Sequence, residues 1–220
     1  MANLLRPVQR SLPLLNRRLQ SRPYSAFNDN LLRILNNELA YLSDYQPPLQ
    51  PPPYFRSFSI DDRPGEQWIR MKSSNPAKNE EIKVDAALFD GIAPIPEAKK
   101  AVYEGEVRLH VSLVVEVSKR DDEGSGSDSD SVLVFICSAW PESIEVQQVF
   151  PLRKRNAMVK PYMGRNFKKL SKEVQTAVLG YLEEREVDDE LAEFLHQYMA
   201  NKDKVEVLRW MKTLESYVRK

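Results

Sequence analysis

Few residues in this 220-residue chain have side chains suited to acid–base or nucleophilic catalysis. There are two histidines, His110 and His196, and one cysteine, Cys137. His110 falls on the polar side of a predicted strand and His196 falls in a predicted helix, where histidines are more often hydrogen-bonded structural groups than catalysts. Cys137 lies in an apolar segment, where burial raises the pKa of a thiol and makes it unreactive. The sequence therefore predicts a non-enzyme with no catalytic residue and no cofactor.

A polar loop at 120–131 concentrates carboxylates that could attract a cation. Its acidic residues are Asp121, Asp122, Glu123, Asp128 and Asp130. Oxygen ligands of this kind suit Ca²⁺, but their spacing is not that of an EF-hand loop. The favoured interpretation is a solvated loop, and weak cation attraction is the alternative. No metal site is predicted.

A basic stretch between Arg153 and Lys172 has no acidic residue and contains Tyr162 and Phe167. Cations interleaved with aromatic rings can follow a phosphate backbone and stack on bases. The candidate anion-binding or RNA-binding residues are Arg153, Lys154, Arg155, Lys160, Arg165, Lys168, Lys169 and Lys172. The favoured interpretation is that these cations offset the acidic remainder of the chain and pair with neighbouring glutamates. Binding of RNA or another anion is the alternative.

The middle of the chain reads as an antiparallel sheet. Residues 106–118 alternate between apolar and polar side chains, with Val114 as the exception on the polar side, which predicts a strand with one buried face. Its inward residues are Val107, Leu109, Val111, Leu113, Val115 and Val117. Residues 132–140, apolar on both faces, predict an interior strand, and 143–150 predict the next one. Weaker strands fit 54–60, 67–72 and 81–88, so six or seven strands in sequence predict a meander without βαβ units.

Helical periodicity flanks this sheet on both sides. A helix over 28–45 is predicted to be capped by Asn28 or Asp29 and to end before Pro47. After the sheet, Ser171 is a plausible cap for a helix whose apolar face contains Val174, Ala177, Val178, Tyr181 and Leu182. A short helix over 189–199 and a last helix over 203–219 follow. The order of helix, sheet and helices predicts an α+β domain.

The first and last predicted helices each carry a narrow apolar seam. Neither helix is long enough to be stable alone in water, so each must pack on the other, on the sheet or on another subunit. The candidate oligomer-interface residues are Leu32, Leu35, Leu39, Leu42, Val207, Trp210, Met211, Leu214 and Val218. The seams are thus a hint of oligomerisation.

The N-terminal segment differs in charge from the rest of the chain. Residues 1–25 contain five arginines and no acid, and removing these arginines leaves 27 basic against 32 acidic residues, a net charge of −5. Residues 1–24 are therefore predicted to be a mitochondrial transit peptide, followed by one domain over 25–220. A basic anion-binding tail and a plastid address are the alternatives. No apolar run approaches the roughly 20 residues of a membrane-spanning helix.

Several segments together resemble the mitochondrial glycoprotein family, also known as mitochondrial acidic matrix proteins, whose best-known member is the complement globular-head and hyaluronan-binding protein. Residues 31–42 resemble its first helix, and 133–137 with 143–146 resemble its central hairpin. Residues 162–167, 194–199 and 208–214 resemble the entry to its second helix and its C-terminal helices. The resemblance covers about residues 28–220 and is strongest in the last sixty.

This resemblance implies a strongly twisted antiparallel sheet of about seven strands inside a doughnut-shaped homotrimer. The first and last helices of the family pair as an antiparallel coiled coil. Its members resemble non-enzymatic matrix scaffolds that bind other proteins and support oxidative phosphorylation and mitochondrial gene expression. The sequence therefore predicts a protein-binding scaffold of the mitochondrial matrix. A direct RNA-binding or mitochondrial ribosome-assembly factor is the alternative, and an enzyme with an unrecognised site is a third and weaker one.

Overall fold

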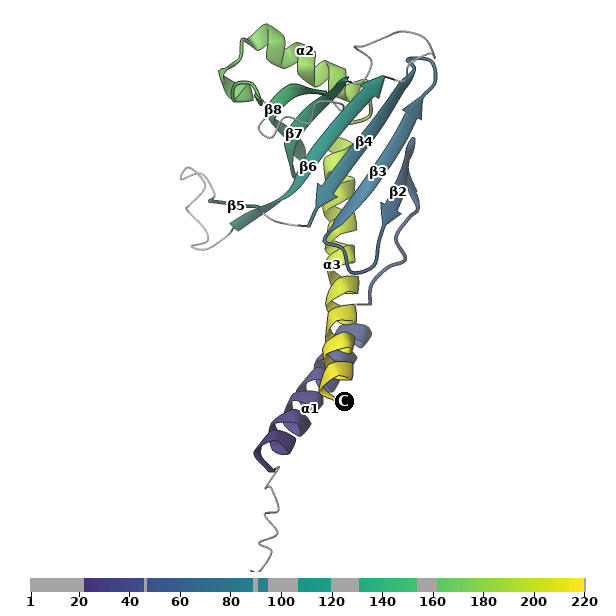
Figure 1. Ribbon diagram of the computed structural model, residues 1–220, viewed down its shortest axis with the longest axis vertical. Helices are drawn as coiled ribbons and strands as arrows, with labels where there is room; N and C mark the ends of the chain where they lie inside the picture. Colours follow the sequence, from purple (N-terminus) through teal and green to yellow (C-terminus); the bar gives the residue numbers. More distant parts are fainter. Residues whose placement is uncertain are drawn as a thin grey trace, which may run out of the picture.

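A twisted sheet stands on a long helical stalk in the computed structural model (Figure 1). The structure describes residues 22–45, 47–88, 91–94, 107–119, 131–153 and 162–219. We call the sheet, the helix α2 (Lys172–Glu183) and residues 189–202 of the helix α3 (Asp189–Val218) the head. The helix α1 (Arg22–Tyr45) and residues 203–218 of α3 form the stalk. The predicted α+β class and the order of its elements are confirmed.

Seven strands lie side by side in the sheet in the same order as in the chain. Each pairs with its neighbours in an antiparallel manner. They are β1 (Tyr54–Phe55), β2 (Phe58–Asp62), β3 (Trp68–Asn75), β4 (Glu80–Ala87), β6 (Val107–Lys119), β7 (Ser131–Trp140) and β8 (Ser143–Arg153). A short strand, β5 (Gly91–Pro94), pairs with β6 outside this path. The predicted meander is confirmed, and β5 is an addition that the sequence did not predict.

Two details of the predicted strands are wrong. The single strand expected over 54–60 is a hairpin, because Arg56 turns the chain with a φ of 49° and places Phe55 opposite Phe58. Leu109 was expected to point into the core, but it is exposed. It lies opposite β5, beyond the part of β6 that pairs with β4 and β7, so it lies outside the core of the described residues.

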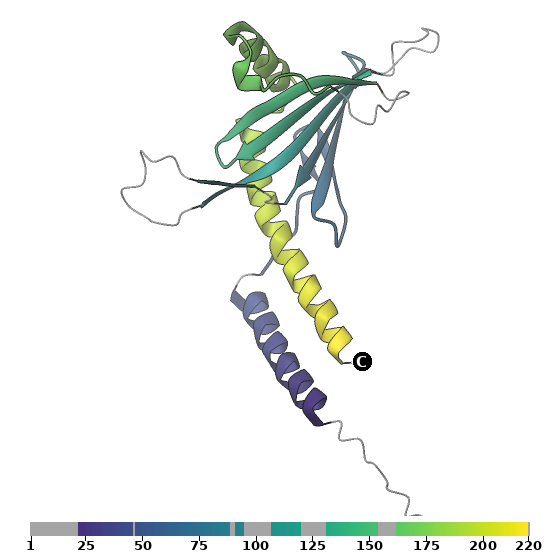
Figure 2. The same cartoon turned by 60° about the vertical axis from the view of Figure 1, so that its left-hand side comes forward.

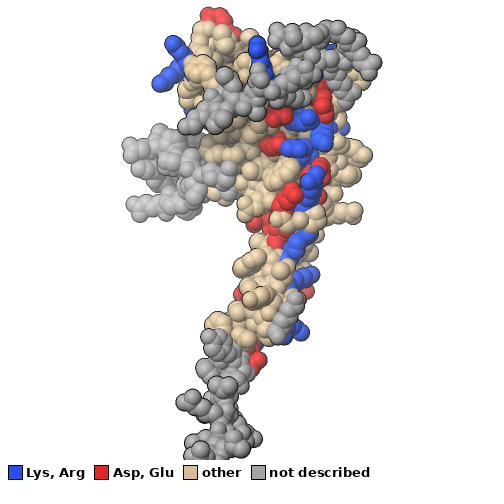
Figure 3. Space-filling model, in the orientation of Figure 1, with Lys and Arg blue, Asp and Glu red and all other residues tan. Residues whose placement is uncertain are grey.

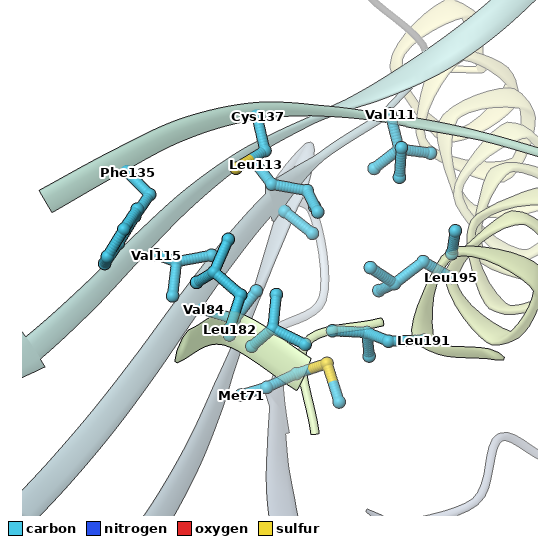
Figure 4. Packing of buried hydrophobic residues seen from close by; sticks show 14 of the residues in the cluster. Met71, Val84, Val111, Leu113, Val115, Phe135, Cys137, Leu182, Leu191 and Leu195 are labelled. Atoms are coloured by element: carbon cyan, nitrogen blue, oxygen red, sulfur yellow. The ribbon is translucent and has the colours of Figure 1, made fainter. Parts of the chain in front are cut away.

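The core lies between one face of the sheet and the two C-terminal helices (Figure 4). The alternating residues of β6 from Val111 to Val117 are buried as predicted, together with Phe135 and Cys137 of β7. The helices contribute Leu182, Leu191 and Leu195, all fully buried. Burying side chains of this size contributes about 1.5–3 kcal/mol each, so this face stabilises the head.

The strand β7 is buried on both faces, as its apolar composition predicts. One face joins the main core, while Val132 and Val134 form a second cluster with Phe150 on the opposite face. β7 lies between β6 and β8, so its interior position is confirmed.

The helix α2 begins as predicted but buries less than predicted. The Ser171 hydroxyl accepts a hydrogen bond from the Val174 amide at 3.4 Å, which satisfies one of the free N–H groups of the first turn. Leu182 is fully buried, whereas Val174 and Ala177 are exposed. Only the C-terminal half of the predicted apolar face therefore packs within this chain.

The last 30 helical residues form one continuous helix, α3, so the predicted break near residue 200 is wrong. The polar residues in the expected gap between the two helices have partners far away in sequence. Asn201 binds the backbone of Leu49, and Lys202 binds Asp62. Because these side chains are satisfied by tertiary contacts, they do not need to end the helix.

The helix α1 runs antiparallel to the second half of α3 (Figures 1 and 2). It ends at Tyr45, immediately before the prolines Pro47 and Pro48, as predicted. It begins at Arg22, so the predicted caps, Asn28 and Asp29, lie inside the helix and that prediction is wrong.

Candidate functional site

The two predicted seams are the more buried parts of the stalk helices. Leu35 is buried within the single chain, and the other seam residues are half-buried. Those half-buried residues are Leu32, Leu39, Leu42, Val207, Met211, Leu214 and Val218. The helices α1 and α3 contact each other in one chain. The predicted interface residues therefore lie on two neighbouring helices, and Trp210 is the exposed one among them.

Large apolar side chains remain exposed around this helix pair. On α1 they include Phe27 and Tyr41, and on α3 they are Trp210 and Tyr217, the last with 77% of its surface exposed. Exposed aromatic groups gathered on one element are typical of protein interfaces. Trp210 is among the residues predicted from the sequence, whereas Phe27 and Tyr41 are not, because they lie off the regular seam spacing. Their size on a polar helix face was the available signal.

A groove of about 650 Å³ runs along the C-terminal half of α3. Leu208, Lys212 and Tyr217 of α3 line it, and Pro48 closes it where the linker leaves α1. An apolar groove with a basic side chain at its edge suits a protein segment better than a small polar substrate. The stalk is therefore the strongest candidate interaction surface among the described residues.

The predicted basic stretch is only partly described. Arg153, at the end of β8, is exposed, as are Arg165, Lys169 and Lys172. Lys168 forms an ion pair with Glu145, and this pair is the largest cause of a lowered pKa of the Glu145 carboxyl. The remaining predicted residues of this stretch, Lys154, Arg155 and Lys160, lie outside the described part of the chain.

Lysines and arginines are mixed with carboxylates on the sheet face seen in Figure 3. Arg70 of β3 forms a bidentate pair with Asp85 of β4, with nitrogen–oxygen distances of 2.6 and 2.7 Å. On β4, Lys83 Nζ lies 3.7 Å from Glu81 Oε2. A face whose charges neutralise each other in this way offers a polyanion little net attraction.

The cysteine and the two histidines have surroundings that are typical of structural residues. Cys137 is buried, and burial raises the pKa of its thiol to about 12, so it stays protonated at neutral pH. The His196 ring nitrogen Nε2 lies 2.9 Å from the Ala139 carbonyl oxygen, and the His110 ring packs against Trp140 at 4.9 Å. Within the described residues, no group of three or more His, Cys, Asp or Glu side chains could hold a metal ion.

Two further expectations concern the membrane and the acidic loop. No helix within the described ranges is long and apolar enough to cross a membrane. Residues 120–130 of the predicted acidic loop lie outside the described residues, and Ser131 is the first residue of β7.

The family model described as mitochondrial glycoprotein matches residues 35–218 of this chain. The chain belongs to the mitochondrial glycoprotein family. It is 24% identical over 184 residues to the mitochondrial acidic protein mam33 of Schizosaccharomyces pombe, covering 74% of this chain and 68% of that protein. It is also 24% identical over 164 residues to an uncharacterized mitochondrial protein of Arabidopsis thaliana, covering 73% of this chain and 62% of that protein.

Two solved structures share the fold. The Trypanosoma brucei p22 protein superposes with a TM-score of 0.68 at 19% identity, covering 88% of this chain and 99% of that one. A Leishmania major protein of unknown function, described as a sequence homologue of human p32, superposes with a TM-score of 0.65 at 15% identity. This match covers 87% of this chain and 99% of that one. The family resemblance and the predicted fold are confirmed. Membership in this family, together with its mitochondrial relatives, supports a mitochondrial location.

Proposed function

We propose that this member of the mitochondrial glycoprotein family is a non-enzymatic, homotrimeric scaffold of the matrix that binds other proteins. The observation that carries this proposal is the stalk, where two helices contact each other and leave Phe27, Tyr41, Trp210 and Tyr217 exposed. Solvation of so many aromatic side chains is unfavourable, so a stalk of this kind favours association. Support of oxidative phosphorylation and mitochondrial gene expression is the broader role that we assign to the scaffold.

The surroundings of the reactive side chains support a binding role over catalysis. The thiol of Cys137 is buried with a raised pKa, and His196 contacts a backbone carbonyl. The family is described by its compartment and composition and not by a reaction. The exposed groove along α3 is the surface through which the scaffold would hold a second chain.

Truncation and crosslinking test the scaffold directly. Removing all residues after Asn201 deletes the α3 part of the stalk, so we expect the shortened protein to lose its trimeric mass or to aggregate. If the truncated protein remains a trimer, the sheet carries the interface and the stalk does not. Crosslinking with mass spectrometry in isolated mitochondria would then name the bound proteins.

The leader of the protein is part of the same proposal. Residues 1–24 act as a transit peptide, and processing before Ser25 would remove the first three residues of α1, which begins at Arg22. N-terminal sequencing of the mitochondrial protein should find a start near Ser25. Recovery of the full-length chain from the cytosol would contradict this.

A second candidate function is direct RNA binding or ribosome assembly through the basic stretch. Tyr162 is 79% exposed, and Arg165, Lys169 and Lys172 are exposed in the same segment. If these cations contact phosphates, log Kd for RNA should rise steeply with log salt concentration. Changing Arg165, Lys169 and Lys172 together to glutamine should then reduce that slope. Changing Lys72, Lys119 and Lys204, which are exposed and lie outside the basic stretch, to glutamine is the matched control. A slope unaltered by either triple variant would remove this candidate.

A further inference from the structure

The head and the stalk are joined by a small polar cluster centred on Lys202. The Lys202 side chain is only 1% exposed in the middle of α3. Its Nζ donates hydrogen bonds to Asp62 Oδ1 at 2.5 Å and to the Arg63 carbonyl oxygen at 3.3 Å, and it lies 3.8 Å from Glu206 Oε1. A buried ammonium group with this set of oxygen partners is satisfied, and it fixes α3 to the end of β2.

The helical turns before and after Lys202 bind the same segment of the sheet. Tyr198 donates its hydroxyl to Asp62 Oδ2 at 3.0 Å, and burial raises the pKa of this hydroxyl, so it stays a donor. Glu206 accepts a hydrogen bond from the Gly65 amide at 3.0 Å. Because residues four apart lie on one helix face, three successive turns of α3 contact the connection from β2 to β3.

The linker from α1 is held at the same level of α3. The Asn201 side chain donates to the Leu49 carbonyl oxygen at 2.8 Å and accepts from the Leu49 amide at 2.7 Å. Lys202 is the last buried residue of α3. Beyond this level, α3 continues as the half of the helix that lies beside α1 (Figure 2). One short part of α3 therefore connects the sheet, the linker and the stalk.

A polar connection has a different physical effect from an apolar one. Burying an ammonium and a carboxylate costs desolvation energy, and apolar residues of similar volume often give equal or greater stability. Hydrogen bonds are directional, however, and their geometry excludes helix orientations that apolar contacts would tolerate. The position of this cluster, where the core ends, is where control of direction has the largest effect on the far end of the stalk.

We propose that Asp62, Tyr198, Lys202 and Glu206 form a conformational brace that fixes the direction of the stalk relative to the sheet. The brace holds within each chain, whatever its oligomeric state. Its consequence, a fixed spacing between the heads of associated subunits, rests on the proposed trimer.

Single-molecule energy transfer within one chain tests the brace. Ser74→Cys in the head and Ser216→Cys in the stalk are both exposed sites for dyes, while buried Cys137 stays unlabelled in the folded protein. Labelled chains are diluted with excess unlabelled protein, so that each signal reports one chain. Lys202→Met keeps most of the side-chain volume but removes the charge, and we expect its distance distribution to shift and broaden. Lys78→Met, which removes an exposed ion pair with Glu184, should leave the distribution unchanged.

Two outcomes would overturn the brace: a folded Lys202→Met protein with the wild-type mean and width, or equal broadening in Lys78→Met. If Lys202→Met does not fold, the double variant Asn201→Ala/Glu206→Gln decides in the same way. Mass by light scattering is measured on the same samples. A single-chain mass with a narrow wild-type distribution that broadens in Lys202→Met would retain the brace and reject the proposed trimer.

Discussion

The two halves of α3 show how one helix can have two different tasks. In the head, Leu191, Leu195 and Met199 are fully buried against the sheet. In the stalk, Met211 and Leu214 are half-buried, and Trp210 is exposed. The first half is part of a core that is complete within the chain. The second half has an apolar surface that a single chain leaves uncovered.

This difference separates folding from assembly. A helix of the length of α1 is marginal in water without a packed face, and pairing with α3 covers only part of its apolar surface. The head can thus be stable by itself, whereas the stalk gains stability when another surface covers its aromatic residues. Mutations of the same chemical kind should therefore behave differently in the two regions.

The largest effect is expected for Leu195→Ala in the head. The side chain is fully buried among the sheet and helix residues, so its truncation should lower the free energy of unfolding by about 2–5 kcal/mol. Urea denaturation at several protein concentrations measures this loss, which should be equal at each concentration. Val174→Ala is the control, because Val174 is exposed on α2 and should cost little. A small loss for Leu195→Ala would mean that the head core is misassigned.

Leu214→Ala should have a smaller effect in a single chain, because Leu214 is only half-buried. The loss in free energy of unfolding should be about 1–2 kcal/mol at low concentration. If the stalk is an assembly surface, the variant should also lower the melting temperature more at high protein concentration, since it weakens association. Leu195→Ala, whose loss should not depend on association, is the internal control. An identical concentration dependence in both variants would remove the distinction between head and stalk.

The smallest effect is expected for the surface pair Glu145–Lys168, which joins β8 to the basic segment. Lys168 lowers the pKa of Glu145 below its ordinary 4.5. A lowered pKa means that the pair stabilises the folded protein above pH 4.5 and that this contribution is lost as the pH falls further. Because both groups are partly exposed, the contribution should stay below about 1 kcal/mol.

Glu145→Gln should therefore lower the stability slightly at pH 7, by less than about 1 kcal/mol, and this difference from the wild type should shrink as the pH falls below 4.5. Denaturation midpoints between pH 3 and pH 7 give the comparison. Glu142→Gln, in the exposed turn before β8, is the matched control. A Glu145→Gln profile that runs parallel to the wild type would show that the pair contributes nothing measurable.

The sequence predicted those features that repeat at short range. The alternation along β6 predicted its buried face from Val111 to Val117, and the seam spacing predicted which leucines of α1 would be least exposed. Prolines at 47 and 48 predicted the end of α1. Each of these patterns is set by residues within two or four positions of each other.

Features that depend on distant partners could not be read in the same way. The gap that was expected between the last two helices contains Asn201 and Lys202, whose partners, Leu49 and Asp62, are 152 and 140 positions away in sequence. The outward position of Leu109 depends on where β5 and β7 pair along β6. For the candidate site, the seams were predicted, but the exposure of Phe27 and Tyr41 required the antiparallel arrangement of α1 and α3.

The central claim is that the stalk makes this protein an oligomer, and mass by light scattering during size-exclusion chromatography tests it most directly. Chains beginning at Ser25 should elute with the mass of three subunits, and chains truncated after Asn201 should not. A wild-type peak at the mass of one chain, roughly 23 kDa for the processed length, would contradict the claim.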